Sequence, residues 1–262
     1  MINQSVDQAA VDNLLVNFDG LKFKSIKIGD DSFKIITNLS CSQLFKSSVD
    51  HDGDAIDSRE VGLNSPSDLT PGVYEGGFKV WECSRDMVQF INDDLQLTGT
   101  INCLDLGCGS GIVGICLLKS IEGSVDFQDF NQNVLINYTL PNILVNCKQS
   151  SVNETWEKLS PRVNFISGDW SNFPKTKRYD YIFSCETIYN QDNYPKLVDI
   201  LTNCLTPNGC AYFAAKSYYF GVGGGVQQFS DFLVDKQLTI EEIKVFPDCV
   251  ERIIVKITIK QS

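Results

Sequence analysis

The sequence has 262 residues but only one histidine, His51, and no pair of cysteines spaced as C-x-x-C. Its ten cysteines are dispersed, and several of them fall inside apolar segments. A zinc site or a disulfide framework is therefore not expected, and reduced, buried thiols are the better interpretation. His51 stands in an acidic segment without amphipathic period, at residues 49–60, so we interpret it as a solvated linker residue rather than a catalytic base.

Long hydrophobic runs and basic residues are also scarce. No stretch of about 18 apolar residues occurs, so no membrane-spanning segment is expected. Residues 1–7 lack the basic start and apolar core of a signal peptide, which favours an intracellular protein. The 22 Lys and Arg against 33 Asp and Glu give a net charge of -11, which argues against direct binding of nucleic acid. Such a charge would attract a basic protein partner, although it could equally serve solubility alone.

The length suits one full α/β domain with an appendage. Near the N-terminus, residues 21–28 and 32–36 alternate apolar and polar side chains on either side of a Gly-Asp-Asp turn, a pattern that predicts a β-hairpin. We therefore expect an N-terminal extension over residues 1–65, made of this hairpin and the acidic linker, followed by the main domain over residues 66–262.

Predicted strands and helices alternate along the main domain. A loop and helix at 74–94 come first, and strands are expected at 101–106, 125–129, 162–167, 179–184 and 210–215, with a final antiparallel pair at 240–246 and 252–259. The helices between them are expected at 112–118, 131–147 (broken near Pro141), 194–205 and 229–234. This order predicts an α/β, Rossmann-like sheet of seven strands, mostly parallel, in which ligands bind at the carboxyl ends of the strands.

A glycine-rich turn joins the first of these strands to its helix. Gly107 and Gly109 let the backbone approach a ligand closely, and the helix start beyond them offers free N–H groups. A dinucleotide fingerprint needs a small residue at its sixth position, where this chain has Ile112. The pattern therefore favours a phosphate-free adenosine ligand. Asp129 ends the next strand, where its carboxylate can accept both ribose hydroxyls, and Asp169 with Trp170 could bind and cover the adenine.

Beyond these physical signals, residues 105–111 (DLGCGSG) resemble motif I of the class I S-adenosylmethionine methyltransferases. Five further segments resemble one branch of that superfamily, the histidine protein methyltransferases; they are residues 72–83, 127–131, 168–170, 185–190 and 216–225. The resemblance extends from about residue 66 to the C-terminal strand. It implies the class I methyltransferase fold and S-adenosylmethionine as the cofactor, with no metal.

The resemblance also implies roles for particular residues. Those expected to bind the cofactor are Val80, Trp81, Glu82, Cys83, Ser84, Asp105, Gly107, Gly109, Gln128, Asp129, Phe130, Gly168, Asp169, Trp170 and Cys185. The segment that begins at Trp81 is expected to close over the methionine end of the cofactor, which Cys185 would also line. Glu186 and Tyr189 resemble an acidic-x-x-Tyr motif that would hold an incoming imidazole in line with the sulfonium methyl. Residues expected to contact the substrate are Lys216, Tyr219, Phe220 and Gly223.

By this resemblance, the protein would methylate the distal (tele) nitrogen of a histidine in large-subunit ribosomal protein number three, acting as a monomer in the cytoplasm and nucleus. A neutral imidazole, with a reference pKa of about 6.5, needs no strong base, whereas lysine, with a reference pKa of about 10.4, must first lose a proton. Three alternatives stay open from the residues alone: a protein-lysine methyltransferase of the neighbouring branch, a non-catalytic S-adenosylmethionine-binding module, and a nicotinamide oxidoreductase, which Ile112 disfavours.

Overall fold

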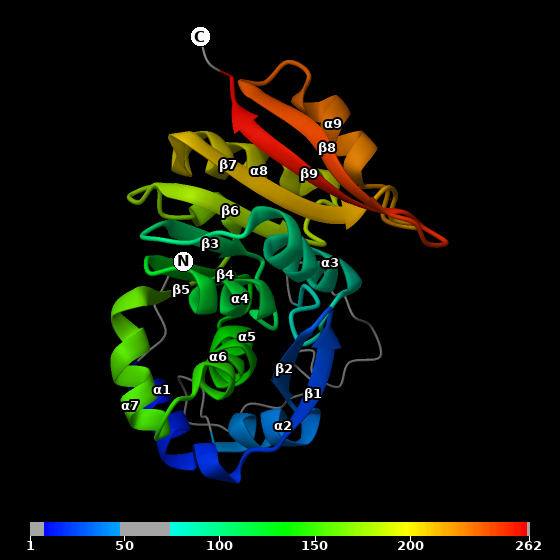
Figure 1. The fold of residues 1–262 in the computed structure, drawn as a ribbon. Coiled ribbons are helices and arrows are strands. Elements are labelled where there is room, and N and C mark those ends of the chain that lie inside the picture. Colours follow the sequence, from blue (N-terminus) through cyan, green and yellow to red (C-terminus); the bar gives the residue numbers. More distant parts are fainter. Residues whose placement is uncertain (1–7, 48–73, 261–262) are drawn as a thin grey trace.

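The computed structural model describes residues 8–47 and 74–260. The acidic segment and His51 lie outside these residues. Figure 1 shows one central sheet flanked by helices on both faces, with a small hairpin at the end remote from the last two strands. Within the described residues, no helix has the length and apolar character needed to cross a membrane.

The central sheet has seven strands in the order β5-β4-β3-β6-β7-β9-β8. The parallel strands are β3 Asn102–Leu106, β4 Ser124–Asp129, β5 Val163–Ser167, β6 Tyr179–Cys185 and β7 Leu205–Lys216; β8 Leu238–Phe246 and β9 Arg252–Ile259 are antiparallel. The predicted fold, including the antiparallel last pair, is confirmed. Because the strand order reverses at β3, the carboxyl ends of β3, β4 and β6 surround a crevice of the kind that binds ligands.

Helices cover the two faces of this sheet in unequal sets. On one face lie α3 Glu82–Phe90, α4 Ile112–Ser120 and α6 Leu140–Cys147, and on the other α8 Tyr194–Cys204 and α9 Val226–Leu233. The remaining helical segments are α5 Gln132–Val134, α7 Val152–Leu159, two π turns, η2 Ile91–Leu95 and η3 Leu135–Thr139, and short 3-10 turns η4 Ser160–Arg162, η5 Trp170–Asn172 and η6 Gln191–Asn193. Residues 112–118 of α4 are all buried, since the helix is packed between the sheet and its neighbours.

The break predicted near Pro141 is not an interruption of the helical path. Residues 132–147 stay helical, and the irregularity is the π turn η3, which ends directly before α6. Pro141 falls in the first turn of α6, where the hydrogen-bonding pattern changes and a missing N–H is tolerated. The proline therefore marks the junction of two kinds of helical turn.

The N-terminal unit, residues 8–47, packs against the main domain. It contains the predicted hairpin, β1 Phe23–Ile28 and β2 Asp31–Ile36, and three segments that the sequence analysis missed: α1 Gln8–Asn17, the 3-10 turn η1 Phe18–Gly20 and α2 Asn38–Ser47. Its apolar side chains join the same core cluster as α3, α4 and α6. Asn146 of α6 accepts from the Lys34 N–H at 2.8 Å and donates to the Lys34 carbonyl at 2.6 Å, so a helix side chain pairs with the free edge of β2.

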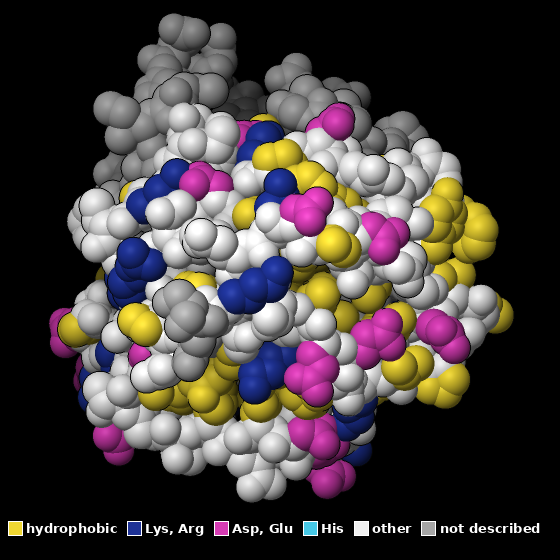
Figure 2. Space-filling view, turned by 90° about the horizontal axis from the view of Figure 1, so that it is seen from above, with side chains coloured by type: hydrophobic (Ala, Val, Ile, Leu, Met, Phe, Trp, Pro, Cys, Tyr) yellow, Lys and Arg dark blue, Asp and Glu magenta, His cyan; other side chains and the backbone are white. Residues whose placement is uncertain are grey.

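The opposite end of the sheet is the edge strand β8. Figure 2 shows this face of the molecule, with Lys and Arg interspersed among Asp and Glu and with hydrophobic side chains between them. Glu241, Glu242 and Lys244 of β8 contribute charge here, and Ile243 and Val245 are partly exposed. Charged side chains on an edge strand discourage pairing with the edge of another chain.

Candidate functional site

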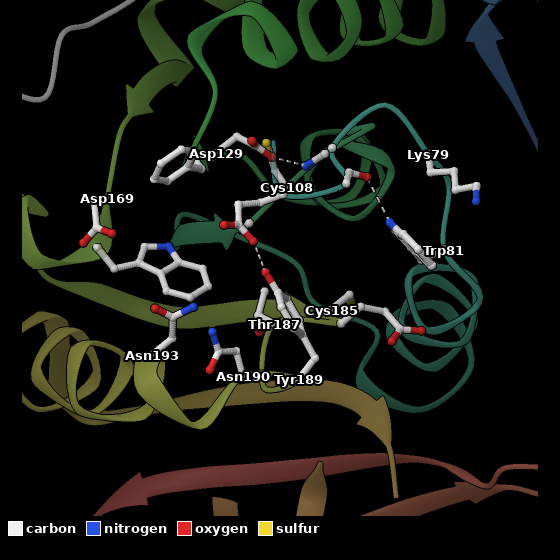
Figure 3. Close-up of a pocket in the computed structure, with 18 of the residues that line it drawn as sticks. Lys79, Trp81, Cys108, Asp129, Asp169, Cys185, Thr187, Tyr189, Asn190 and Asn193 are labelled. Carbon is white, nitrogen blue, oxygen red and sulfur yellow. Dashed lines mark hydrogen bonds between the residues drawn. The ribbon is translucent and has the colours of Figure 1, made fainter. Parts of the chain in front are cut away.

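A cavity of about 270 Å³ opens at the carboxyl ends of the parallel strands (Figure 3). The predicted site residues that line it are Trp81, Ser84, Gly107, Gly109, Asp129, Phe130, Gly168, Asp169, Trp170, Cys185, Glu186 and Tyr189. They come from segments that are far apart in the sequence. In Figure 3, Asp169 and Trp81 lie at opposite sides of the cavity, with Asp129 on a third side and Tyr189 between them.

Other predicted site residues do not line this cavity. They are Val80, Glu82, Cys83, Asp105 and Gln128, and, after β7, Lys216, Tyr219, Phe220 and Gly223. Conversely, the cavity wall includes residues that the sequence analysis did not single out: Glu75, Gly76, Gly77, Lys79, Cys108, Thr187, Asn190, Asp192, Asn193 and Lys196. Most of these stand within the motif segments already recognised. Asp192, Asn193 and Lys196 belong to η6 and the start of α8, and no sequence pattern marks them.

The glycine turn, residues 107–111, needs glycine for two reasons: its backbone angles are left-handed, and neighbouring atoms leave no room for a Cβ. Gly107 and Gly109 have φ of 70° and 49°. A Cβ on Gly107 would lie 2.7 Å from the Thr187 Cγ2 atom, and one on Gly109 would lie 3.1 Å from the Gly77 carbonyl oxygen. Any larger residue would therefore be strained and would enter the space at the cavity wall.

Buried side chains behind the glycine turn hold its backbone. The Asp105 carboxylate accepts from the Gly114 N–H at 2.9 Å, and burial raises the pKa of Asp105 to about 8. Thr139 donates to the Gly109 carbonyl at 2.7 Å, and Asn142 donates to the Ser110 carbonyl at 3.0 Å. Asp105 is thus placed to stabilise the turn from behind.

Asp129 lies at the tip of β4, where it is 5% exposed. Its two carboxylate oxygens accept from the Gly109 N–H at 3.0 Å and the Asn131 N–H at 3.1 Å. Burial raises the pKa of Asp129 to about 6, and these hydrogen bonds oppose that rise. Each carboxylate oxygen has a further lone pair. An ionised Asp129 can therefore accept from a ligand diol as well.

Gln128 does not line the cavity, but its hydrogen bonds hold the residues that form the side near Asp169. Gln128 accepts from the Trp170 indole N–H at 2.7 Å and from the Gly107 N–H at 3.2 Å, and it donates to the Gly168 carbonyl at 3.0 Å. These bonds fix the Trp170 ring against the cavity. Asp169 pairs with Lys196 at 2.8 Å. Burial alone would raise the pKa of Asp169, but hydrogen bonds from Lys196 and Ser171 outweigh it and hold the pKa below its usual value.

The opposite side is formed by the start of α3 and the end of β6. The Trp81 indole donates to the Gly76 carbonyl at 3.1 Å, and the Lys79 ammonium lies 5.0 Å from the Trp81 ring centroid. Ser84 and Cys185 line the wall beside it. These aromatic and small side chains offer a less polar surface than the side that carries Asp129.

Glu186 follows β6 with an unusual backbone and an unusual side chain. Its φ is 57°, a left-handed conformation that costs a non-glycine residue about 1–2 kcal/mol. The Oε2 atom accepts from the Tyr219 hydroxyl, while Oε1 is buried and makes no hydrogen bond of normal geometry with the described residues. A buried acceptor left without a partner costs about 1–3 kcal/mol. Strain and an unpaired acceptor at one residue point to a functional position.

Two neighbouring groups complete this end of the cavity. The Cys83 thiol is close to Glu186, and burial followed by the Glu186 charge raises its pKa well above the usual value, so the thiol stays protonated. The Tyr189 hydroxyl donates to Glu75, and the Tyr189 ring packs edge-on against Tyr219, with 6.2 Å between ring centroids. Tyr189 therefore joins the loop before α3 to the end of β6.

The aromatic loop, residues 216–225, follows β7 and contains the remaining predicted substrate residues. Gly221, Gly223 and Gly225 have positive φ, and the Gly224 N–H donates to the Tyr189 carbonyl at 3.0 Å. Phe220 is 77% exposed. The loop thus borders the site and presents an aromatic side chain to solvent. No cluster of three or more His, Cys, Asp or Glu residues suited to a metal ion occurs in the part of the chain that the structure describes.

Comparisons with known proteins agree with this geometry. A family model described as "Lysine methyltransferase" matches residues 70–221. Histidine protein methyltransferase 1 homolog of Dictyostelium discoideum is 39% identical over 206 residues, which cover 76% of this chain and 62% of that protein. Histidine protein methyltransferase 1 of Schizosaccharomyces pombe is 35% identical over 232 residues, covering 74% of this chain and 68% of the relative.

A solved structure shows the same fold. The crystal structure of a putative methyltransferase from Bacillus halodurans aligns with a TM-score of 0.51 and 13% identity, covering 67% of this chain and 99% of that one. The chain spans less than two thirds of the length of its relatives from Dictyostelium discoideum and Bos taurus. The family model nevertheless covers more than half of the chain, and the yeast relative is matched over more than two thirds of its length. The chain therefore belongs to the methyltransferase family of that model, among the histidine protein methyltransferases.

Proposed function

We propose that the protein transfers a methyl group from S-adenosylmethionine to the tele nitrogen of a histidine in a protein substrate. One observation carries the proposal: a single cavity is lined by the Asp129 carboxylate, suited to a ribose, and by Glu186 and Tyr189, suited to an incoming imidazole. The names of the relatives support the reaction class.

The residues present fit this cofactor. The volume of about 270 Å³ lies just below the usual range for small-molecule sites, about 300–1,000 Å³. Asp129 would accept from the ribose hydroxyls, Trp170 would cover the adenine, and Trp81, Ser84 and Cys185 would surround the methionine end. When bound, the cofactor supplies an electrophilic methyl group on a sulfonium. The glycine turn leaves room because a Cβ on Gly107 or Gly109 would enter the same space.

The protein's own contribution is alignment and charge stabilisation. Glu186, which lines the cavity, would accept the proximal N–H of a neutral imidazole, so that the distal nitrogen carries the lone pair that faces the methyl group. As the ring gains positive charge during transfer, its hydrogen bond to the carboxylate strengthens, so Glu186 stabilises the transition state more than the ground state. Tyr189, tied to Glu75, would fix the neighbouring wall.

A lysine substrate is the second candidate, because the matching family model carries that description. A carboxylate beside an amine favours its charged form, which has no free lone pair. With a reference pKa of about 10.4, lysine would be held in that unreactive form far more strongly than imidazole, whose reference pKa is about 6.5. The carboxylate of Glu186 at the cavity wall therefore favours histidine.

The resemblance of the motifs supports the finer assignments. They are a basic substrate, namely large-subunit ribosomal protein number three, action as a monomer in the cytoplasm and nucleus, and no direct contact with nucleic acid. The net charge of -11 suits a basic protein partner.

The test is to incubate the purified protein with labelled S-adenosylmethionine and that ribosomal protein, followed by acid hydrolysis and amino-acid analysis. We expect tele-methylhistidine as the labelled product, and methyllysine would refute the proposal. Asp129→Ala should abolish binding of S-adenosylhomocysteine in calorimetry while the circular dichroism spectrum is retained.

A further inference from the structure

Lys196 lines the cavity, but the proposed function gives it no role. It stands in the first turn of α8, directly after Pro195, where the helix dipole is positive and disfavours a cation. Residues 194–197 (YPKL) include no acid that would offset its charge. Because lysine is an unfavourable choice for the helix itself, its position points to a partner outside the helix.

That partner is Asp169, directly before η5. The Lys196 Nζ atom donates to Asp169 Oδ2 at 2.8 Å, while Asp169 Oδ1 accepts from the Ser171 N–H at 2.8 Å. These hydrogen bonds outweigh the effect of burial and hold the pKa of Asp169 below its usual value, so the carboxylate stays ionised. The pair faces the cavity, because both residues line it and their side chains, Lys196 and Asp169, are 31% and 35% exposed.

Both groups keep hydrogen-bonding capacity for a ligand. An ammonium carries several N–H donors, of which Asp169 takes one, and the carboxylate keeps lone pairs on both of its oxygens. The pair therefore presents a donor beside an acceptor. Figure 3 shows Asp169 on the same side of the cavity as Asn193 and away from Trp81, so this pattern belongs to one end of the cavity.

An adenine ring has the complementary edge. Its 6-amino group donates, and the ring nitrogens on either side of that group, N1 and N7, accept. Trp170 follows Asp169 in the chain, and its indole is held by Gln128 at 2.7 Å. A base stacked on Trp170 would have the Asp169–Lys196 pair beside its edge, since all three residues line one cavity.

We propose that Lys196 binds the cofactor directly: its ammonium, anchored by Asp169, donates to a ring nitrogen beside the 6-amino group of adenine. Asp169 accepts from the amino group itself, so the two residues recognise both features of that edge. The inference rests on the proposed function, because it takes S-adenosylmethionine as the cofactor. It adds a residue that determines the specificity for adenine.

The test combines one substitution in the protein with one atom change in the ligand. Lys196→Met removes the ammonium but keeps an unbranched, flexible side chain. Lys175→Met is the matched control, because Lys175 pairs with Asp199 of the same helix at similar exposure, 40% and 41%, but does not line the cavity. Calorimetry measures the affinity of each full-length protein for S-adenosylhomocysteine and for its 1-deaza and 7-deaza analogues, in which a C–H group replaces N1 or N7.

Lys196→Met should bind S-adenosylhomocysteine at least about tenfold more weakly than wild type, as expected for loss of a hydrogen bond from a charged donor. Lys175→Met should stay within about twofold of wild type. Wild type should bind one of the two deaza analogues at least about tenfold more weakly than S-adenosylhomocysteine. Lys196→Met should bind that analogue and S-adenosylhomocysteine with nearly equal affinity, because the donor is already missing.

An equal loss of affinity for the deaza analogues in wild type and in Lys196→Met would overturn the inference, because the ring nitrogen would then bind another donor, such as Asn193. The same result is expected if the ion pair with Asp169 is only structural. Equal affinity of wild type for all three ligands would also overturn the inference, while the proposed function stands. If wild type does not bind S-adenosylhomocysteine, the proposed function fails, and the inference with it.

Discussion

Asn142 of α6 connects the N-terminal unit to the glycine turn, so its removal should weaken both. The side chain is fully buried. Its oxygen accepts from the Ile36 N–H of β2 at 2.8 Å, and its nitrogen donates to the Ser110 carbonyl at 3.0 Å. Asn142→Ala would leave one buried N–H and one buried carbonyl without partners. Each such group costs about 1–3 kcal/mol, so the free energy of unfolding should fall by about 2–6 kcal/mol.

Asn146→Ala is the matched control, because it removes the same amide from the same helix about one turn later. Asn146 makes two backbone bonds to Lys34 and donates to the Asn142 carbonyl at 2.7 Å. Lys34 is exposed, so water can replace the bonds to it, and the Asn142 carbonyl belongs to the helix itself. We expect a loss below about 1 kcal/mol. Urea unfolding followed by circular dichroism measures both changes in the free energy of unfolding. Calorimetry with S-adenosylhomocysteine tests whether only Asn142→Ala lowers the affinity for that ligand. Equal unfolding midpoints for Asn142→Ala and wild type would refute the reasoning.

Two further predictions concern the glycine turn. The raised pKa of Asp105, about 8 against a usual 3.8, means that the folded state binds more protons than the unfolded chain between these values, so stability should decrease as the pH rises from 5 to 8. Asp105→Asn should flatten this decrease in urea unfolding, and an equally steep decrease would contradict the assignment. Gly107→Ala should weaken binding of S-adenosylhomocysteine, because its Cβ would approach Thr187 Cγ2 to 2.7 Å. Adding Thr187→Ser, which removes that methyl group, should restore part of the affinity in calorimetry; no recovery would mean that the φ of 70° dominates.

Local sequence patterns predicted those elements whose signal lies in consecutive residues. Alternation at 21–28 and 32–36 gave the hairpin, and the alternation of apolar strands with helices gave the sheet and its antiparallel last pair. The helix α1 was missed although Val11 and Leu14 are buried at a helical spacing, because the segment has no charged first or last turn to mark its ends. The Pro141 rule gave the place of an irregularity but not its form, since a π turn has no sequence signature of its own.

Contacts between distant residues could not be predicted in the same way. Thr139 and Asn142 hold the glycine turn, yet in the sequence they are two polar residues in an apolar helix, 30 and 32 positions from the carbonyls they bind. Glu186 and Tyr219 are 33 positions apart, and neither residue type indicates that one oxygen of the carboxylate will be occupied. Such pairs arise only when the sheet brings its strand ends together. Motif resemblance located the segments, but the role of each residue within a segment depends on tertiary structure.

The two sides of the cavity are held by segments from opposite ends of the chain. The Asp129 side is held by the glycine turn, whose Ser110 carbonyl is bound through Asn142 to strand β2 of the N-terminal unit. On the Glu186 side, Arg252 of β9 binds the buried Asp86 of α3 at 2.5 Å. The first residue of the aromatic loop beyond β7, Ser217, also donates to the Glu251 carbonyl at 2.8 Å, directly before β9. Loosening the N-terminal unit should therefore weaken cofactor binding first, whereas loosening the last hairpin should alter substrate alignment while the cofactor still binds.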